Sequence, residues 1–259
     1  MIVPAFGIFA IIAYASVLIL HMMYGNHTSP TIKFFSYFLI MIGLITHAMQ
    51  LHHLIDTSQG QNLSWLNLIS LLTWLSGLLI MLASFSLPIL SLNFLLYPVA
   101  ILFLGLNYFL HPVYFIVTKN QPQMLVHILS ATAVVAFLII AAIQSVLLFF
   151  QQLILKQKKL LAVLNFLPPL ETMKRLLFLE INLNFIVLSI FFLLTLYLVK
   201  PIVLLHYWAA SLLSVFLWII FLFLVFIRYF FRWRPATGAL SVIVALCIGL
   251  LIYLTSHLR

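Results

Sequence analysis

The sequence has 259 residues, of which 66% are hydrophobic and 6% are charged, with 12 Lys and Arg against 3 Asp and Glu. Soluble globular domains carry about 25% charged residues, so this composition excludes a soluble domain and predicts an integral membrane protein. The basic residues lie between apolar runs and do not form one basic face, which disfavours a nucleic-acid-binding protein. Cys247 is the one cysteine, which excludes a disulfide, a C-x-x-C-H haem attachment site and a cysteine zinc site.

Eight apolar runs are long enough to cross a bilayer, which takes about 20 residues per helix. They cover residues 4–23, 35–54, 65–87, 91–110, 123–151, 178–199, 204–227 and 237–257. Nearly all of the prolines lie at or just outside the ends of these runs, where a missing N–H costs little. Pro98 lies inside the fourth run and predicts a kink there. The sequence therefore predicts an all-α membrane protein, one transmembrane domain with about eight helices.

The Lys and Arg residues in the loops predict the orientation, because cytoplasmic loops are enriched in them. With the N-terminus outside, the inner loops hold Lys33, Lys156, Lys158, Lys159, Lys174, Arg175, Arg228, Arg232 and Arg234. The outer segments then hold Lys119, Lys200 and Arg259. This bias favours eight helices with both termini outside.

The longest polar connection is the inner connector at residues 152–177. It has a basic stretch, then a break at Pro168–Pro169, then apolar residues on one helical face: Leu170, Met173, Leu176 and Leu177. That spacing predicts an interfacial helical elbow, in which Glu171 can pair with Lys174. The connector is either a solvated linker or a docking site for a cytoplasmic partner.

The histidines gather near the predicted outer boundary of the membrane. Seven of the nine lie there: His47, His52, His53, His111, His127, His206 and His257. Interfacial solvation or a simple hydrogen bond is one explanation, because amphipathic side chains favour that interface. His47 shares a helical stripe with Gly43, Gln50 and Leu54, which predicts that it faces the bundle and either ligates a cofactor or bonds a neighbouring helix.

His127 and His206 are the stronger candidates for a pair of metal-ligating histidines. Each heads a helical face with small residues, where helices can approach closely, and each follows an outer lysine, Lys119 or Lys200. Two neutral imidazoles from different helices can ligate haem iron, while outer cations can meet the haem propionates. Snorkelling at loop ends is the alternative reading of the lysines.

Other chemistry has weaker support in the sequence. Neutral imidazole also suits zinc and copper, but there is no H-E-x-x-H motif, and Asp56 is the one acidic residue near the outer histidines. There is also no G-x-S-x-G, P-loop or G-x-G-x-x-G motif, so we predict that the protein is not an enzyme. On the inner half, polar residues form either interhelical hydrogen bonds or a second ligand site: Gln144, Glu180, Asn182 and Asn184.

Four features follow one another along the chain: the histidine in LVHILSATAVV, the connector ending in LPPLETMKRLLF, then His206, and RWRPATGAL before the last run. In this order they resemble the cytochrome c assembly family. That family includes the haem-handling proteins CcmC and CcsA, and its HemX/YpjD-like branch is the more similar over residues 120–259. The Arg232–Arg234 turn resembles the family's G-W-R-G turn without its glycines. The W-G-x-x-W-x-W-D segment of CcmC and CcsA is absent, and only Tyr207 and Trp208 are aromatic beside His206.

The resemblance implies a haem-binding or haem-handling protein of the bacterial inner membrane, with non-covalent haem at the outer side. His127 and His206 would be the axial ligands, with His47 or His53 in reserve, and Lys119 and Lys200 nearby. Two alternatives stay open. In the first, the protein is a small-molecule or ion transporter. In the second, it is a regulatory or structural subunit that docks a cytoplasmic partner through residues 152–177.

Overall fold

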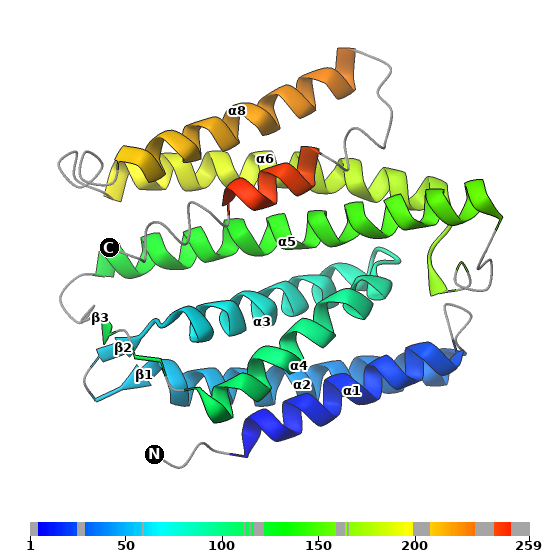
Figure 1. The fold of residues 1–259 in the computed structure, drawn as a ribbon, viewed down its shortest axis with the longest axis horizontal. Helices are drawn as coiled ribbons and strands as arrows, with labels where there is room; N and C mark the ends of the chain where they lie inside the picture. The colour runs from blue at the N-terminus through cyan, green and yellow to red at the C-terminus, as the bar shows by residue number, and fades with distance from the viewer. Residues whose placement is uncertain are drawn as a thin grey trace. The chain divides into compact units, whose positions relative to one another are not determined.

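The computed structural model describes residues 5–24, 29–58, 60–110, 112–113, 115–116, 122–158, 164, 166–198, 208–230 and 241–249. The longer helices are α1 (Phe6–Tyr24), α2 (Pro30–Ile55), α3 (Trp65–Ser84), α4 (Asn93–Phe109), α5 (Pro122–Gln157), α6 (Leu170–Leu198) and α8 (Trp208–Phe230) (Figure 1). A 3-10 turn, η1 (Leu90–Leu92), leads into α4, and residues 241–249 form a further helix.

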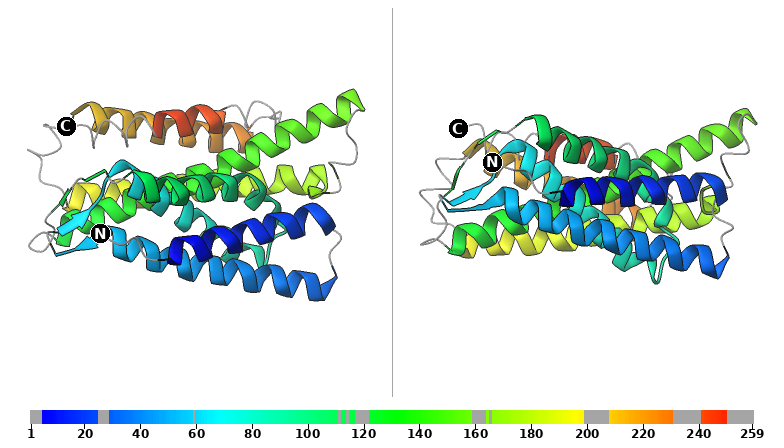
Figure 2. Two further views of the ribbon diagram at one scale, coloured as in Figure 1. Left: turned by 60° about the horizontal axis from the view of Figure 1, so that its bottom comes forward. Right: turned by 90° about the horizontal axis from the view of Figure 1, so that it is seen from below.

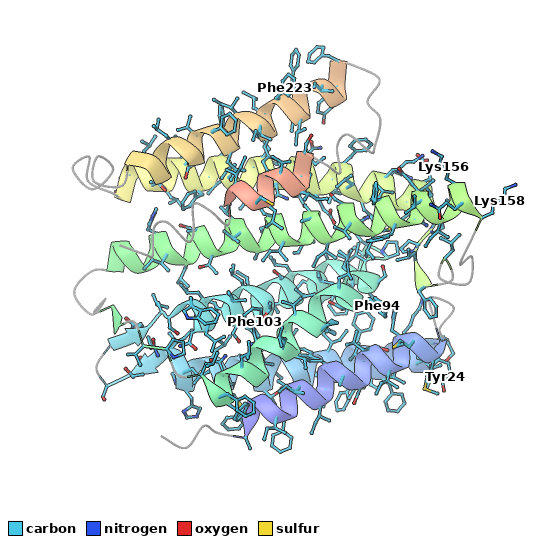
Figure 3. The ribbon with its side chains drawn as sticks, in the orientation of Figure 1. Tyr24, Phe94, Phe103, Lys156, Lys158 and Phe223 are labelled. Carbon is cyan, nitrogen blue, oxygen red and sulfur yellow. The ribbon has the colours of Figure 1, made fainter. Side chains whose placement is uncertain are left out.

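Six helices in this described part are long and apolar enough to cross a membrane: α1, α2, α3, η1 with α4, α5 and α6. The described part of α8 adds a shorter apolar stretch, Ser214–Ile227. Large apolar side chains are exposed on these helices, such as Phe94 at 41% and Phe223 at 59% (Figure 3). Lipid is the solvent that makes such exposure favourable. The prediction of a helical, multi-pass membrane protein is confirmed at this level.

The helices form two compact units. The first unit comprises Met1–Asn120 and Ile154–Pro168, and the second comprises Gln121–Leu153 and Pro169–Arg259. The first unit therefore holds α1 to α4, while the second holds most of α5 together with α6, α8 and the helix at residues 241–249.

In the first unit, α1 and α2 lie side by side (Figure 2), and α4 packs against α1 and α3. The face of α1 toward its neighbours is built of small residues and one aromatic: Gly7, Ala10, Ala13, Tyr14 and Val17. Gly43 of α2 allows the close approach, because a Cβ there would lie 2.6 Å from Cε1 of Tyr14. Small residues at helix interfaces are how membrane helices gain packing contacts.

A short antiparallel sheet follows α2, outside all of the predicted spans. Its strands are β1 (Asp56–Thr57), β2 (Gly60–Asn62) and β3 (Phe115–Ile116), in the order β1-β2-β3. Gly60 has φ 132°, a conformation that side chains disfavour, and the Thr57 hydroxyl donates to its carbonyl oxygen at 2.6 Å. The sheet links the end of α2 to the segment after α4.

The structure corrects the bounds of the predicted connector at residues 152–177. The helix α5 continues to Gln157, and α6 begins at Leu170, directly after Pro168 and Pro169. The predicted elbow is the first part of α6 and not a separate interfacial helix. Three of its four apolar residues are buried, Met173, Leu176 and Leu177, and the buried apolar residues Ile181 and Leu188 follow further along α6.

Candidate functional site

His127 lies on α5 near the start of that helix, beside the last turns of α6. Its ring stacks on Phe191, with centroids 5.4 Å apart and planes 26° apart. Its Nδ1 atom lies 3.4 Å from the Thr195 hydroxyl oxygen. Phe191 and Thr195 are one turn apart on α6, so a single stripe of that helix contacts the imidazole from two directions.

These contacts favour one tautomer of His127. The Thr195 hydroxyl donates its hydrogen to the Phe191 carbonyl oxygen at 2.9 Å, so its oxygen is left to accept a bond. The hydrogen bond then requires Nδ1–H on His127, which leaves the lone pair of Nε2 available. Metal-ligating histidines commonly donate their other ring N–H to an oxygen acceptor in this way. His127 therefore fits the chemistry of an axial haem ligand.

Three predicted site residues lie outside the described residues: His206, Lys119 and Lys200. The assignment of a second axial ligand and of the propionate contacts stays a prediction. Of the remaining predicted ligands, His47 and His53 belong to the first unit and His127 to the second.

His47 is fully buried inside the first unit, where both of its ring nitrogens have partners. Nδ1 lies 3.2 Å from the Tyr14 hydroxyl, and Nε2 lies 2.9 Å from Oγ of Ser70. Tyr14 in turn stacks on Tyr97 at 4.5 Å. These four residues, the His47 cluster, connect α1, α2, α3 and α4.

The prediction that the His47 stripe faces the bundle is confirmed, because Gly43, His47 and Gln50 are all buried. Gln50 accepts a hydrogen bond from the backbone N–H of Gly7 at 3.2 Å, which ties α2 to α1. Since His47 uses both nitrogens in hydrogen bonds, it has none free for iron in this arrangement. The structure thus favours the bond to a neighbouring helix over the ligand role.

His53 lies at the exposed end of α2. Its ring stacks on Phe6 of α1 at 5.8 Å and lies 6.0 Å from the ring of His52. His52 in turn lies 3.9 Å from the Asp56 carboxylate. Within the described ranges, no group of three or more His, Cys, Asp or Glu side chains is placed to hold a metal ion.

The inner polar residues of the second unit make interhelical bonds. The Gln144 amide of α5 donates to the Met173 carbonyl oxygen of α6 at 3.0 Å, and the Asn184 amide of α6 donates to the Phe137 carbonyl oxygen of α5 at 3.3 Å. The prediction of interhelical hydrogen bonding is confirmed for these two residues.

Sequence reasoning missed Thr195, Tyr14 and Ser70. All three lie inside apolar runs, and hydroxyl groups there commonly bond the carbonyl of their own helix, as Thr195 does. A weak signal exists for Tyr14 alone, since a tyrosine in the middle of a membrane helix needs a partner for its hydroxyl.

No family model matches the chain, and no curated protein sequence or solved structure matches it.

Proposed function

We propose that this chain is a haem-handling membrane protein of the cytochrome c assembly type, with non-covalent haem held at the outer side by His127 and His206. One observation supports the proposal most. The Thr195 hydroxyl donates to the Phe191 carbonyl oxygen and lies 3.4 Å from Nδ1 of His127, an arrangement that favours Nδ1 as the donor and Nε2 as the atom for the iron. The sequence resemblance over residues 120–259 supports this choice of family.

Each residue of this site would have a distinct role. His127 would bind the iron through Nε2, Thr195 would hold the tautomer and the ring angle, and Phe191 would pack against the ring. Bound haem would supply an iron centre that imidazole nitrogen can ligate. An imidazole whose orientation is already set loses less entropy when it binds.

The proposed topology has eight spanning helices and both termini outside a bacterial inner membrane. The helix α5 carries His127 near its start and Lys156 in its last turn. Because cytoplasmic surfaces attract Lys and Arg, the Lys156 end of α5 would lie inside and His127 outside. This supports a haem site on the outer face.

The proposal is tested by visible absorption spectra of the full chain purified in mild detergent, oxidised and then reduced with dithionite. We expect a Soret band and sharp reduced α and β bands in the wild type. His127→Ala and His206→Ala should each weaken them. His52→Ala is the matched control, because His52 is also an outer histidine but is exposed beside Asp56, and it should keep the wild-type spectrum.

A rescue experiment separates a lost ligand from a damaged fold. His127→Gly leaves space where the imidazole was, so imidazole added to that variant should restore the absorbance bands. Unchanged spectra in both His127→Ala and His206→Ala would refute the assignment. A wild-type protein that stays colourless after haem is added would favour the regulatory-subunit or transporter alternatives.

A further inference from the structure

Glu180 is an acidic side chain buried inside a candidate membrane span of the second unit. The chain has three acidic residues, and the side chains of the other two, Asp56 and Glu171, are 58% and 76% exposed. Glu171 also has a cation beside it, Lys174 at 3.2 Å. Glu180 is 8% exposed and lies within the span Leu170–Tyr197. Glu180 is therefore the acidic residue whose negative charge, if ionised, would be buried in an apolar interior.

No cation neutralises Glu180 among the residues that the structure describes. The two ion pairs there are His52–Asp56 and Glu171–Lys174, and Oε2 of Glu180 is buried without a hydrogen-bond partner. An unpaired carboxylate in an apolar interior is strongly disfavoured. The carboxyl must therefore carry a proton or share a small cation, and intramembrane acids of this kind usually mark ion or proton sites.

Two hydrogen bonds hold α5 against α6 on either side of Glu180. One joins Gln144 to the Met173 carbonyl, and the other joins Asn184 to the Phe137 carbonyl. Met173, Glu180 and Asn184 are spaced by seven and four residues, so they share one face of α6. Glu180 thus lies on the face of α6 that is hydrogen-bonded to α5, between Met173 and Asn184 along the helix.

Gln144 supplies a second polar atom without a partner on this interface. The residue is fully buried, its amide nitrogen is used by Met173, and its Oε1 atom has no hydrogen-bond partner within the described ranges. An amide oxygen accepts only, whereas a protonated carboxyl donates and a carboxylate accepts. Within the described part of the chain, Glu180 and Gln144 therefore each present an unpartnered oxygen on the interface between α5 and α6. Leaving both groups unsatisfied is destabilising.

The other titratable groups near α6 do not replace such a ligand. On the elements packed against it, the described ones are His127 and Lys156 on α5, Tyr229 on α8, and Cys247 on the helix at residues 241–249. His127 bonds Thr195, some fifteen residues along α6 from Glu180, and Lys156 and Tyr229 lie in the last turns of their helices. On α6 itself, Lys174 pairs with Glu171, and Arg175 and Tyr197 are exposed.

We propose that Glu180 and Gln144 form an exchangeable cation site inside the second unit, which takes a proton or a small monovalent cation. In the resting state the carboxyl holds the proton. When the proton leaves to solvent, a cation such as Na⁺ takes its place on the carboxylate oxygen and the Gln144 amide oxygen. This site is independent of haem and of His127.

The test is labelling of the purified full chain with dicyclohexylcarbodiimide, which adds to protonated carboxyl groups in apolar surroundings, followed by mass spectrometry. We expect label on Glu180 that falls progressively as the buffer is made more alkaline. Glu180→Gln should abolish it, and Glu171→Gln, at an exposed acid, should leave it unchanged. Gln144→Leu should shift the pH at which labelling is half lost, whereas Gln152→Leu, a half-buried residue on the same helix, should not.

Two further arms identify the ligand, and size-exclusion chromatography checks that each variant is folded. Labelling reduced several-fold by sodium chloride but not by choline chloride would show that Na⁺ occupies the site. Labelling that depends on pH alone would show a proton site. Absence of label at every pH, or label that is independent of pH, would overturn the proposal.

Discussion

The Tyr14 hydroxyl lies 3.2 Å from Nδ1 of His47, with both side chains buried where α1 meets α2. The Tyr14 ring is also stacked on Tyr97 and sits against Gly43. A polar pair in lipid-embedded helices is stabilising because both groups lack water as an alternative partner. Together with Ser70 and Tyr97, the pair links the four helices of the first unit.

Replacing His47 by leucine should destabilise the first unit without removing haem. His47→Leu leaves the hydroxyls of Tyr14 and Ser70 without their ring-nitrogen partners, which costs about 1–3 kcal/mol per buried group. We expect a lower melting temperature in detergent and an unchanged haem spectrum. His53→Leu, at an exposed ring, is the matched control and should melt like the wild type. A lost Soret band with a normal melting temperature would instead make His47 a ligand.

Gly43→Ala should destabilise the α1–α2 contact. The new Cβ would lie 2.6 Å from Cε1 and 2.9 Å from Cδ1 of Tyr14, and that ring has little freedom because it is stacked on Tyr97. Overpacking of this kind costs about 1–3 kcal/mol. Gly105→Ala is the control, since nothing lies within 4 Å of a Cβ there, and it should be neutral or stabilising by up to about 1 kcal/mol. Thermal melts of the two variants measure the difference, and equal melting temperatures would contradict the close contact.

Thr195→Val should weaken haem binding while His127 stays in place. Valine has the shape of threonine but cannot accept the Nδ1–H bond, so the imidazole loses its fixed tautomer. Loss of such a supporting bond lowers metal affinity by about 10-fold or more. Haem titration of the cofactor-free protein, followed by absorbance, measures the change. Thr195→Ser keeps the hydroxyl and should bind like the wild type, and equal affinity in Thr195→Val would rule out an orienting role.

Asn67→Ala should loosen the sheet beside α2. The Asn67 amide donates to the Asn62 carbonyl oxygen at 2.9 Å and to the Leu54 carbonyl oxygen at 3.4 Å, so it joins β2 to the end of α2. We expect faster amide hydrogen exchange at residues 56–62, measured by mass spectrometry. Asn107→Ala is the control, because that amide donates to Phe103 of its own helix. Unchanged exchange in Asn67→Ala would show that the strands hold without it.

Hydropathy predicts the long helices well, because bilayer thickness sets the length of an apolar run. Hydropathy predicts the ends of these helices less well. The helix α5 continues past the apolar run to Gln157, since lysine is a good helix former and can keep its charge in water while its stem lies along apolar surface. The sheet could not be predicted, because strands of two or three residues show no alternation of apolar and polar side chains.

The candidate site, too, could be predicted only in part from the sequence. The stripe of Gly43, His47 and Gln50 is visible in the sequence because helical periodicity is local. Its partners are not, since Tyr14 and Ser70 meet His47 only after three helices have packed. In the same way the role of Thr195 depends on the register of α6 against α5, sixty-eight residues apart along the chain at this contact, and no local pattern encodes that register.

The length of α5 has a consequence for the membrane itself. Its 36 residues make a rod about 54 Å long, at about 1.5 Å per residue. A hydrocarbon layer is about 30 Å thick, and even a tilt of about 40° leaves about 41 Å along the bilayer normal. The helix must therefore project into water, and the end with Lys156 and Lys158 is the one whose charges suit it (Figure 3). That end is a rigid spacer, and deleting one of its turns would lower and rotate whatever follows it relative to the membrane surface.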